Sequence, residues 1–283
     1  MSFFNPFEYD DKSDVESDEK KQSGIILFLK IFFRKFWKFA AVNFIYFLVT
    51  LPVLLQMYLS FNGFLAEVIG EEGLNFLPGL GIYAAVIVNF PPVLMNVLMV
   101  VSIILYGPVK MGMTYILRNF ACEDHAWFSD LFSRAKSNRK QGLIFGILDF
   151  AVIGFLLNNI FGIFSGVLPI VSSLRFLSII ALVYYSFMRR YFFMLAVTVE
   201  LSVFSIIKNS FIFACIGLGR NILASAACAA TWYVCLFIYP PVTFFALPLI
   251  TYSLAGFCEV FICYPVVHKY MVIPSLEREA TKM

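Results

Sequence analysis

The chain has 283 residues, of which 61% are hydrophobic, 18% aromatic and only 14% charged. A soluble domain carries about 25% charged residues, and one water-soluble core of this size could not bury so much apolar surface. The net charge of +3 is too small to indicate a nucleic-acid partner. Because the apolar runs are long and continuous, the composition favours an all-α membrane protein.

Residues 1–22 are predicted to form a disordered acidic tail. The segment holds seven Asp and Glu residues and lacks the basic start and apolar core of a signal peptide. In residues 23–39, Lys30, Arg34 and Lys38 recur at every fourth position and share one helix face. This second segment is either an amphipathic helix at the membrane interface or simply a basic flank of the first span.

Six apolar runs follow, each near or above the roughly 20 residues that cross a bilayer as a helix. They cover about 39–60, 86–109, 143–164, 176–198, 221–239 and 243–267. We expect a bundle of six transmembrane helices in a single integral membrane domain spanning residues 23–270. Cytoplasmic amphipathic segments are expected at about 119–141 and 200–219, and a cytoplasmic tail at 271–283.

Lys and Arg are distributed unevenly between the predicted loops. The connections after the second and fourth spans and both membrane-proximal chain ends are basic, whereas the alternate loops carry only Arg175. Positive loops stay in the cytoplasm, so both termini and the two basic loops should be cytoplasmic. The expected location is the plasma membrane, with the lipid bilayer as the principal partner.

Several ionisable residues fall inside the predicted spans, where burial in lipid is costly and indicates a functional site. Asp149 lies nine residues after Lys140, and Glu259 lies nine before His268. At the helical rise, each acid is about 13–15 Å from the cytoplasmic end of its span. The candidate intramembrane cluster comprises Asp149, Arg189, Arg190, Arg220 and Glu259. It is a cavity for a substrate or proton, a structural ion-pair cluster, or a set of charges on helices that extend into water.

The loop after the second span combines aromatic and basic residues. Trp127, Phe128, Leu131 and Phe132 should share an apolar helix face, with basic residues beside it. The candidate docking loop comprises Trp127, Phe128, Asp130, Phe132, Arg134, Lys136 and Asn138. It either lies on the inner leaflet or docks to a partner membrane protein.

The same region carries the most recognisable residue pattern of the chain. The pattern is Gly107-Pro108, Gly112, Tyr115, Arg118-Asn119, Glu123, His125, Trp127, Asp130, Lys136, Asn138 and Gln141-Gly142. It resembles the YesL-like integral membrane proteins of Gram-positive bacteria, a family long catalogued as a domain of unknown function. The resemblance covers about residues 36–270. It implies six spans and a frequent genomic association with sugar-uptake and polysaccharide-utilisation systems, and it implies no catalytic residues.

No motif for nucleotide binding, zinc proteolysis or serine hydrolysis is present, and the six cysteines lack metal-type spacing. We therefore expect no enzyme activity, metal or cofactor. The leading expectation, which rests on the resemblance, is a non-enzymatic accessory protein for carbohydrate uptake that partners sugar-transporter permease subunits. The alternative is a small-solute transporter or channel that uses the charged cluster. A third candidate is an enzyme acting on a lipid or lipid-linked sugar.

Overall fold

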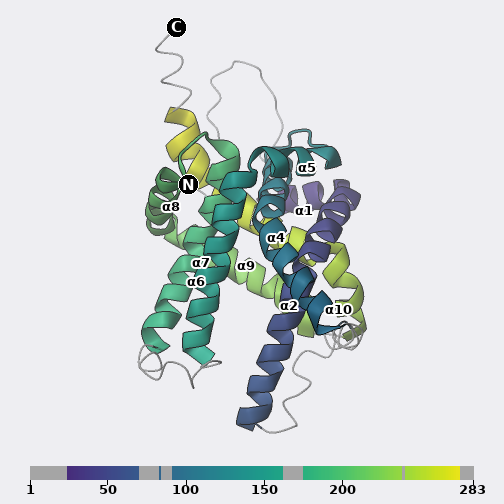
Figure 1. The fold of residues 1–283 in the computed structure, drawn as a ribbon. Helices are drawn as coiled ribbons and strands as arrows, with labels where there is room; N and C mark the ends of the chain where they lie inside the picture. Colours follow the sequence, from purple (N-terminus) through teal and green to yellow (C-terminus); the bar gives the residue numbers. More distant parts are fainter. Residues whose placement is uncertain (1–23, 70–82, 84–90, 162–174, 238–239, 275–283) are drawn as a thin grey trace, which may run out of the picture.

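The structure of the chain is a computed structural model that describes residues 24–69, 83, 91–161, 175–237 and 240–274 (Figure 1). Within these ranges the secondary structure is helical throughout, with short connections and no strand. The predicted acidic tail at 1–22 lies outside the described residues. Most of the predicted C-terminal tail, 275–283, lies outside them as well.

The helices follow one another closely along the chain. The α-helices are α1 (Gly24–Arg34), α2 (Phe36–Ile69), α4 (Pro92–Ala121), α5 (Phe128–Ser137), α6 (Arg139–Phe161), α7 (Arg175–Thr198), α8 (Val203–Ile216), α9 (Leu218–Phe237), α10 (Pro240–Ala246) and α11 (Tyr252–Val267). Two π-helical stretches, η3 (Leu247–Thr251) and η4 (His268–Val272), join α10 to α11 and extend α11.

Five helical stretches are long and apolar enough to cross a membrane, which confirms the predicted all-α membrane class. They are Phe36–Leu59, Val93–Ala121, Arg139–Phe161, Arg175–Thr198 and Thr243–Val272. α8 and α9 meet at a bend of 89° and provide a sixth crossing only if the pair counts as one broken span. The predicted fifth span at 221–239 is therefore the one that differs in form.

One predicted span end was wrong. The second span was expected to end at 109, but α4 continues through Gly107-Pro108 to Ala121. The first span, predicted at about 39–60, matches the apolar stretch Phe36–Leu59, although the helix α2 itself continues to Ile69. A proline removes one backbone donor but need not end a membrane helix that other helices cover.

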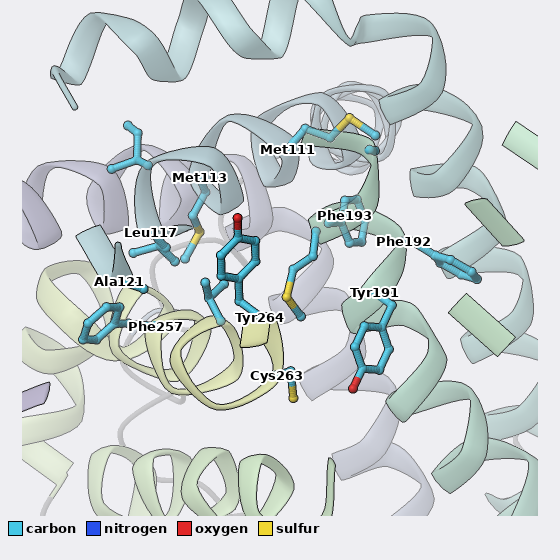
Figure 2. Close-up of a cluster of buried hydrophobic side chains, with 14 of the residues drawn as sticks. Met111, Met113, Leu117, Ala121, Tyr191, Phe192, Phe193, Phe257, Cys263 and Tyr264 are labelled. Atoms are coloured by element: carbon cyan, nitrogen blue, oxygen red, sulfur yellow. The ribbon is translucent and has the colours of Figure 1, made fainter. Parts of the chain in front are cut away.

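α4 is the central helix of the bundle and contacts α2, α5, α6, α7 and α11. It contributes Met111, Met113 and Leu117, each at most 1% exposed, to the main apolar core. Figure 2 shows Met113 and Leu117 beside Phe257 and Tyr264 of α11, whereas Met111 points away from these two rings. The alternation of flexible methionines with rigid aromatic rings fills the space between helices that cross at different angles.

Glycines bring α4 and α6 into close contact. Gly142 and Gly146 are four residues apart on α6 and face Gly107-Pro108 of α4. A Cβ atom on Gly142 would lie 2.8 Å from the Pro108 Cα, and one on Gly146 would lie 3.0 Å from the Gly107 Cα. This small-residue crossing is typical of membrane helix pairs and places α4 against the α6 segment that carries Asp149.

The two ends of the bundle carry different elements. In Figure 1, α5 and η4 lie toward one end and α10 lies toward the other. The basic connection between α4 and α6 and the C-terminal extension of α11 are thus on the same side. This is the side that the Lys and Arg pattern predicts to be cytoplasmic.

Candidate functional site

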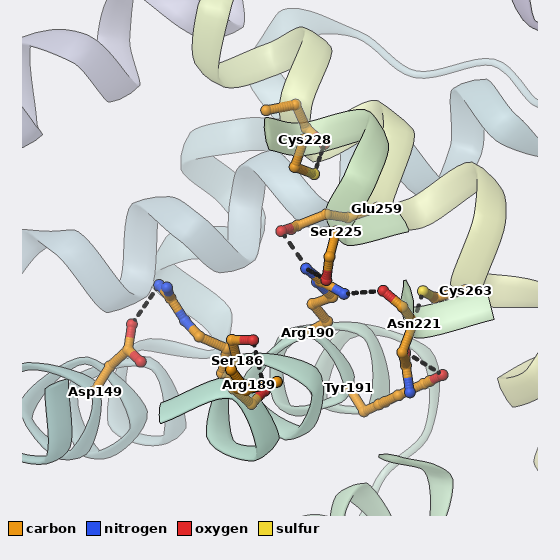
Figure 3. Close-up of polar contacts among 12 residues, drawn as sticks. Asp149, Ser186, Arg189, Arg190, Tyr191, Asn221, Ser225, Cys228, Glu259 and Cys263 are labelled. Atoms are coloured by element: carbon orange, nitrogen blue, oxygen red, sulfur yellow. Dashed lines mark hydrogen bonds and ion pairs between the residues drawn. The ribbon is translucent and has the colours of Figure 1, made fainter. Parts of the chain in front are cut away.

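Two neighbouring arginines on α7 organise the polar interior of the bundle. Successive residues on an α-helix project about 100° apart, so Arg189 and Arg190 reach different helices. Figure 3 shows Arg189 directed toward Asp149 of α6, while Arg190 is directed toward Glu259 of α11 and residues of α9.

Arg189 belongs to a three-residue network with α4 and α6. Its Nη2 lies 2.6 Å from Asp149 Oδ2 and 2.7 Å from the Tyr106 hydroxyl, which donates to the same carboxylate oxygen at 2.7 Å. The Asp149 side chain is 3% exposed and that of Arg189 is 31% exposed. The Tyr185 hydroxyl is also buried near Asp149, but no hydrogen bond of ordinary geometry joins it or Asp149 Oδ1 to the described residues. The network therefore buries the acid and leaves the cation accessible.

Arg190 has the opposite arrangement. Its Nε lies 3.3 Å from Glu259 Oε1, its Nη1 donates to the Asn221 carbonyl at 2.9 Å, and its Nη2 donates to Ser225 Oγ at 2.8 Å. The Arg190 side chain is 7% exposed and that of Glu259 is 26% exposed. All three guanidinium nitrogens are used, so the buried cation is satisfied while its acid remains accessible.

Lys110 is the third cation of the interior, and the sequence analysis missed it. A predicted span end at 109 placed this residue at the membrane surface. α4 continues eleven residues further to Ala121, so Lys110 lies about 16 Å inside the helix end. Its ammonium lies 5.3 Å from the centre of the Tyr46 ring and forms no hydrogen bond or ion pair with the described residues. The apolar run after Lys110 was the available signal for this deeper position.

Glu259 connects Lys110 to the two arginines. Glu259 forms its ion pair with Arg190, and the charges of Lys110 and Arg189 are near enough to act on the same carboxylate. Three cations and the two carboxylates Asp149 and Glu259 thus share one region of the bundle, which leaves one excess positive charge. Such a cluster can accept the negative group of a ligand, because an uncompensated charge away from water is costly.

Arg220 does not join this cluster. Its Nη1 donates to the Ile262 carbonyl of α11 at 3.1 Å instead of pairing with an acid. The prediction assumed that the helix continued unbroken from Lys208. The bend between α8 and α9 instead directs Arg220 away from the charged cluster. The structure therefore brings four of the five candidate residues together in two pairs. It adds Lys110, Tyr106, Asn221 and Ser225, which the sequence analysis did not select.

The candidate docking loop forms the short helix α5, and the apolar residues of this helix differ in exposure. Trp127, Phe128 and Phe132 are 71%, 42% and 51% exposed, whereas Leu131 is fully buried. Leu131 was expected on the same surface, but its backbone approaches Gly112 and anchors α5 to α4.

The polar residues of this loop have separate positions. Asp130 Oδ2 accepts from the Trp127 N–H at 2.8 Å and so stabilises the first turn of α5. Arg134 donates to the Tyr115 hydroxyl at 3.2 Å. Lys136 and Asn138 line a pocket beside the junction of α5 and α6.

The basic segment before the first span forms α1 and a separate contact with the α4–α5 turn. Arg34 Nη2 lies 2.7 Å from Glu123 Oε1, and Lys35 and Lys38 donate to backbone carbonyls of the same turn. Glu123 has φ 58°, the left-handed conformation that a tight turn requires here. Burial lowers the pKa of Lys35, and the adjacent cations Arg34 and Lys38 lower this pKa further. These three cations therefore hold the start of the first span against the α4–α5 turn, in addition to flanking the span.

These features define a multi-span all-α membrane protein with a partly accessible charged cluster inside its bundle. Within the described ranges, no three His, Cys, Asp or Glu side chains are grouped as metal ligands would be. Comparisons of the chain with protein-family models, with curated proteins and with solved structures each found no match.

Proposed function

We propose that the protein binds a small anionic solute inside the membrane and serves its passage as a transporter or channel. The observation that carries this proposal is Lys110, a cation deep in α4 with no hydrogen bond or ion pair among the described residues. A lysine in a membrane helix is costly unless a partner compensates it, and such residues mark solute and ion pathways.

Neighbouring contacts support an anion rather than a cation as the ligand. Each guanidinium nitrogen of Arg190 makes a hydrogen bond, and Asp149 is buried against Arg189 and Tyr106. The accessible groups that remain are Lys110, Arg189 and Glu259. Two cations around one carboxylate complement a negative ligand group and can hydrogen bond to polar atoms beside it.

Thermal unfolding of the purified protein in detergent tests this proposal with chloride, acetate, lactate and benzoate as probes. Gluconate keeps the sodium concentration and ionic strength constant. At least one probe should raise the midpoint, since a ligand that binds only the folded state stabilises it. The Lys110→Gln variant should lose this increase, and the Lys269→Gln control should keep it. A wild-type protein that no probe stabilises, or a Lys110→Gln variant stabilised equally, would contradict the proposal.

A second candidate function is that of a non-enzymatic accessory protein for carbohydrate uptake in a bacterial plasma membrane. The resemblance to YesL-like proteins suggests it, and the exposed Trp127, Phe128 and Phe132 at the start of α5 favour it. Partner permease subunits of a sugar transporter should then co-purify with the protein in mild detergent. A Trp127→Ser, Phe132→Ser variant should lose them, while a variant altered at the exposed Phe176 of α7 should retain them.

A further inference from the structure

A second positively charged site lies at the basic end of the bundle, apart from the interior cluster. An open pocket of about 860 Å³ separates the α5–α6 junction from the connection between α7 and α8. Lys136, Arg139 and Lys140 line it on one side, and Glu200 is the single carboxylate among the lining residues. None of these four side chains forms an ion pair with the described residues, so the pocket carries two excess positive charges.

The pocket walls are connected to each other and offer neutral donors. Gln141 Nε2 donates to the Leu201 carbonyl at 2.8 Å, which ties the start of α6 to the chain after α7. Ser133, Ser137 and Asn138 add hydroxyl and amide groups to the lining. Topology alone accounts for basic residues on this side of a membrane, but it does not account for their grouping with hydrogen-bond donors around one hollow.

We propose that this pocket binds a phosphate group, carried either by an anionic lipid headgroup or by a soluble phosphate ester. Arginine matches phosphate oxygens with paired donors, and lysine adds a compact positive charge. The volume lies within the range of ordinary small-molecule sites, about 300–1,000 Å³. Anionic lipids of the inner leaflet are attracted to basic groups at this level.

The pocket is distinct from the interior cluster along the same helix pair. Phe145 of α6 and Phe192 of α7 are almost fully buried and stack with ring centres 5.2 Å apart. They lie between the pocket residues and the Asp149–Arg189 pair in both helix sequences. Phosphate binding here therefore does not depend on Lys110 and does not rest on the proposed function.

Two measurements on the full chain separate the two sources of phosphate. In the first, the protein is purified from detergent micelles that contain phosphatidylcholine and phosphatidylglycerol. Native mass spectrometry then counts the phosphatidylglycerol molecules that stay bound. Calorimetric titration of protein in phosphatidylcholine nanodiscs with glycerol 3-phosphate measures binding of a soluble ester. We expect binding in at least one measurement, and a lower affinity at higher ionic strength because the charges are exposed.

Variants that remove a positive or a negative charge from the pocket should change its affinity in opposite directions, which makes the test specific. Arg139→Gln and Lys140→Gln should each weaken binding by about threefold, the size expected for a partly screened surface charge. Glu200→Gln should strengthen it by about threefold, a gain that misfolding cannot produce. Lys208→Gln removes a basic residue of α8 that is not part of the pocket lining and should leave binding unchanged.

Three results would overturn the proposal. The first is binding in neither measurement. The second is a loss with Lys208→Gln equal to that with Lys140→Gln, which would indicate a general surface field. The third is an unchanged affinity in Glu200→Gln. Lys110→Gln should not alter phosphate binding, so this outcome is independent of the anion test for the interior cluster.

Discussion

Arg189 and Arg190 are adjacent in the chain and bind acids in opposite ways. In the Arg189 pair the acid, Asp149, is 3% exposed and the cation is 31% exposed. In the Arg190 pair the cation is 7% exposed and the acid, Glu259, is 26% exposed. The buried member of each pair has further hydrogen bonds: Tyr106 donates to Asp149 while it accepts from Arg189, and Asn221 and Ser225 accept from Arg190.

This contrast separates a structural role from a binding role. A buried charge is tolerated only when it is paired and hydrogen bonded, so Asp149 and Arg190 hold helices together. The accessible members, Arg189 and Glu259, keep part of their surface available beside the unpaired Lys110. Replacing Arg189, the main partner of the buried Asp149, should therefore lower stability. Replacing Glu259 should mainly change binding, because its partner Arg190 keeps other hydrogen bonds.

The largest effect is expected for Arg189→Leu. This change leaves the buried Asp149 carboxylate with Tyr106 alone, and orphaning a buried ion-pair partner costs about 3–5 kcal/mol in the free energy of unfolding. The double variant Asp149→Leu, Arg189→Leu should recover most of that loss, because no unpaired charge remains. Denaturant unfolding in mixed micelles measures both. If the free energy of unfolding of Arg189→Leu lay within about 1 kcal/mol of the wild-type value, the Asp149 pair would not have the structural role that this contrast assigns to it.

The next effect concerns the glycine crossing that supports the Asp149 network. Gly142→Ala should destabilise by about 1–3 kcal/mol, the usual cost of overpacking, because the new Cβ would press on Pro108. Gly154→Ala on the same helix is the matched control, since no atom lies within 4 Å of its added Cβ. That control should be neutral or gain about 0.5–1 kcal/mol. Equal losses in both variants would mean that helix flexibility, not the crossing, matters.

Glu259→Gln should cost less stability than Arg189→Leu. Arg190 keeps the Asn221 carbonyl and Ser225, so the expected loss is about 1 kcal/mol, that of one hydrogen bond. Removing this negative charge should also increase the stabilisation by the anion that wild type binds, since the cluster becomes more positive. Thermal unfolding with and without that anion measures both effects. A loss of stability as large as that of Arg189→Leu would show that Glu259 is structural too.

The smallest effect is expected at the exposed pair of Arg34 and Glu123. Their side chains are 48% and 47% exposed, and ion pairs in water contribute little. Arg34→Gln should lower the free energy of unfolding by no more than about 0.5 kcal/mol. The same unfolding assay sets this baseline for the two interior pairs. A loss above about 1 kcal/mol would show that exposure does not rank these ion pairs.

Polar residues inside spans illustrate how far sequence reasoning reaches. Asn43 lies in the first apolar run, where an amide needs hydrogen-bond partners: its Nδ2 donates to the Leu247 carbonyl at 2.8 Å and its Oδ1 accepts from the Ser253 N–H at 2.9 Å. The need for a partner follows from the apolar surroundings. The partners themselves are backbone groups in and after η3, which no hydropathy pattern reveals.

Hydropathy by itself determined the all-α membrane class and most span positions, because crossing a bilayer requires about 20 consecutive apolar residues whatever surrounds them. The apolar runs around Asp149 and Glu259 also determined that these two acids need partners. Only the tertiary structure decided the partners of Arg189 and Arg190 and the bend at Gly217, where an added Cβ would meet the Tyr191 hydroxyl. Those features depend on which helix faces which, and such contacts join residues far apart in the chain.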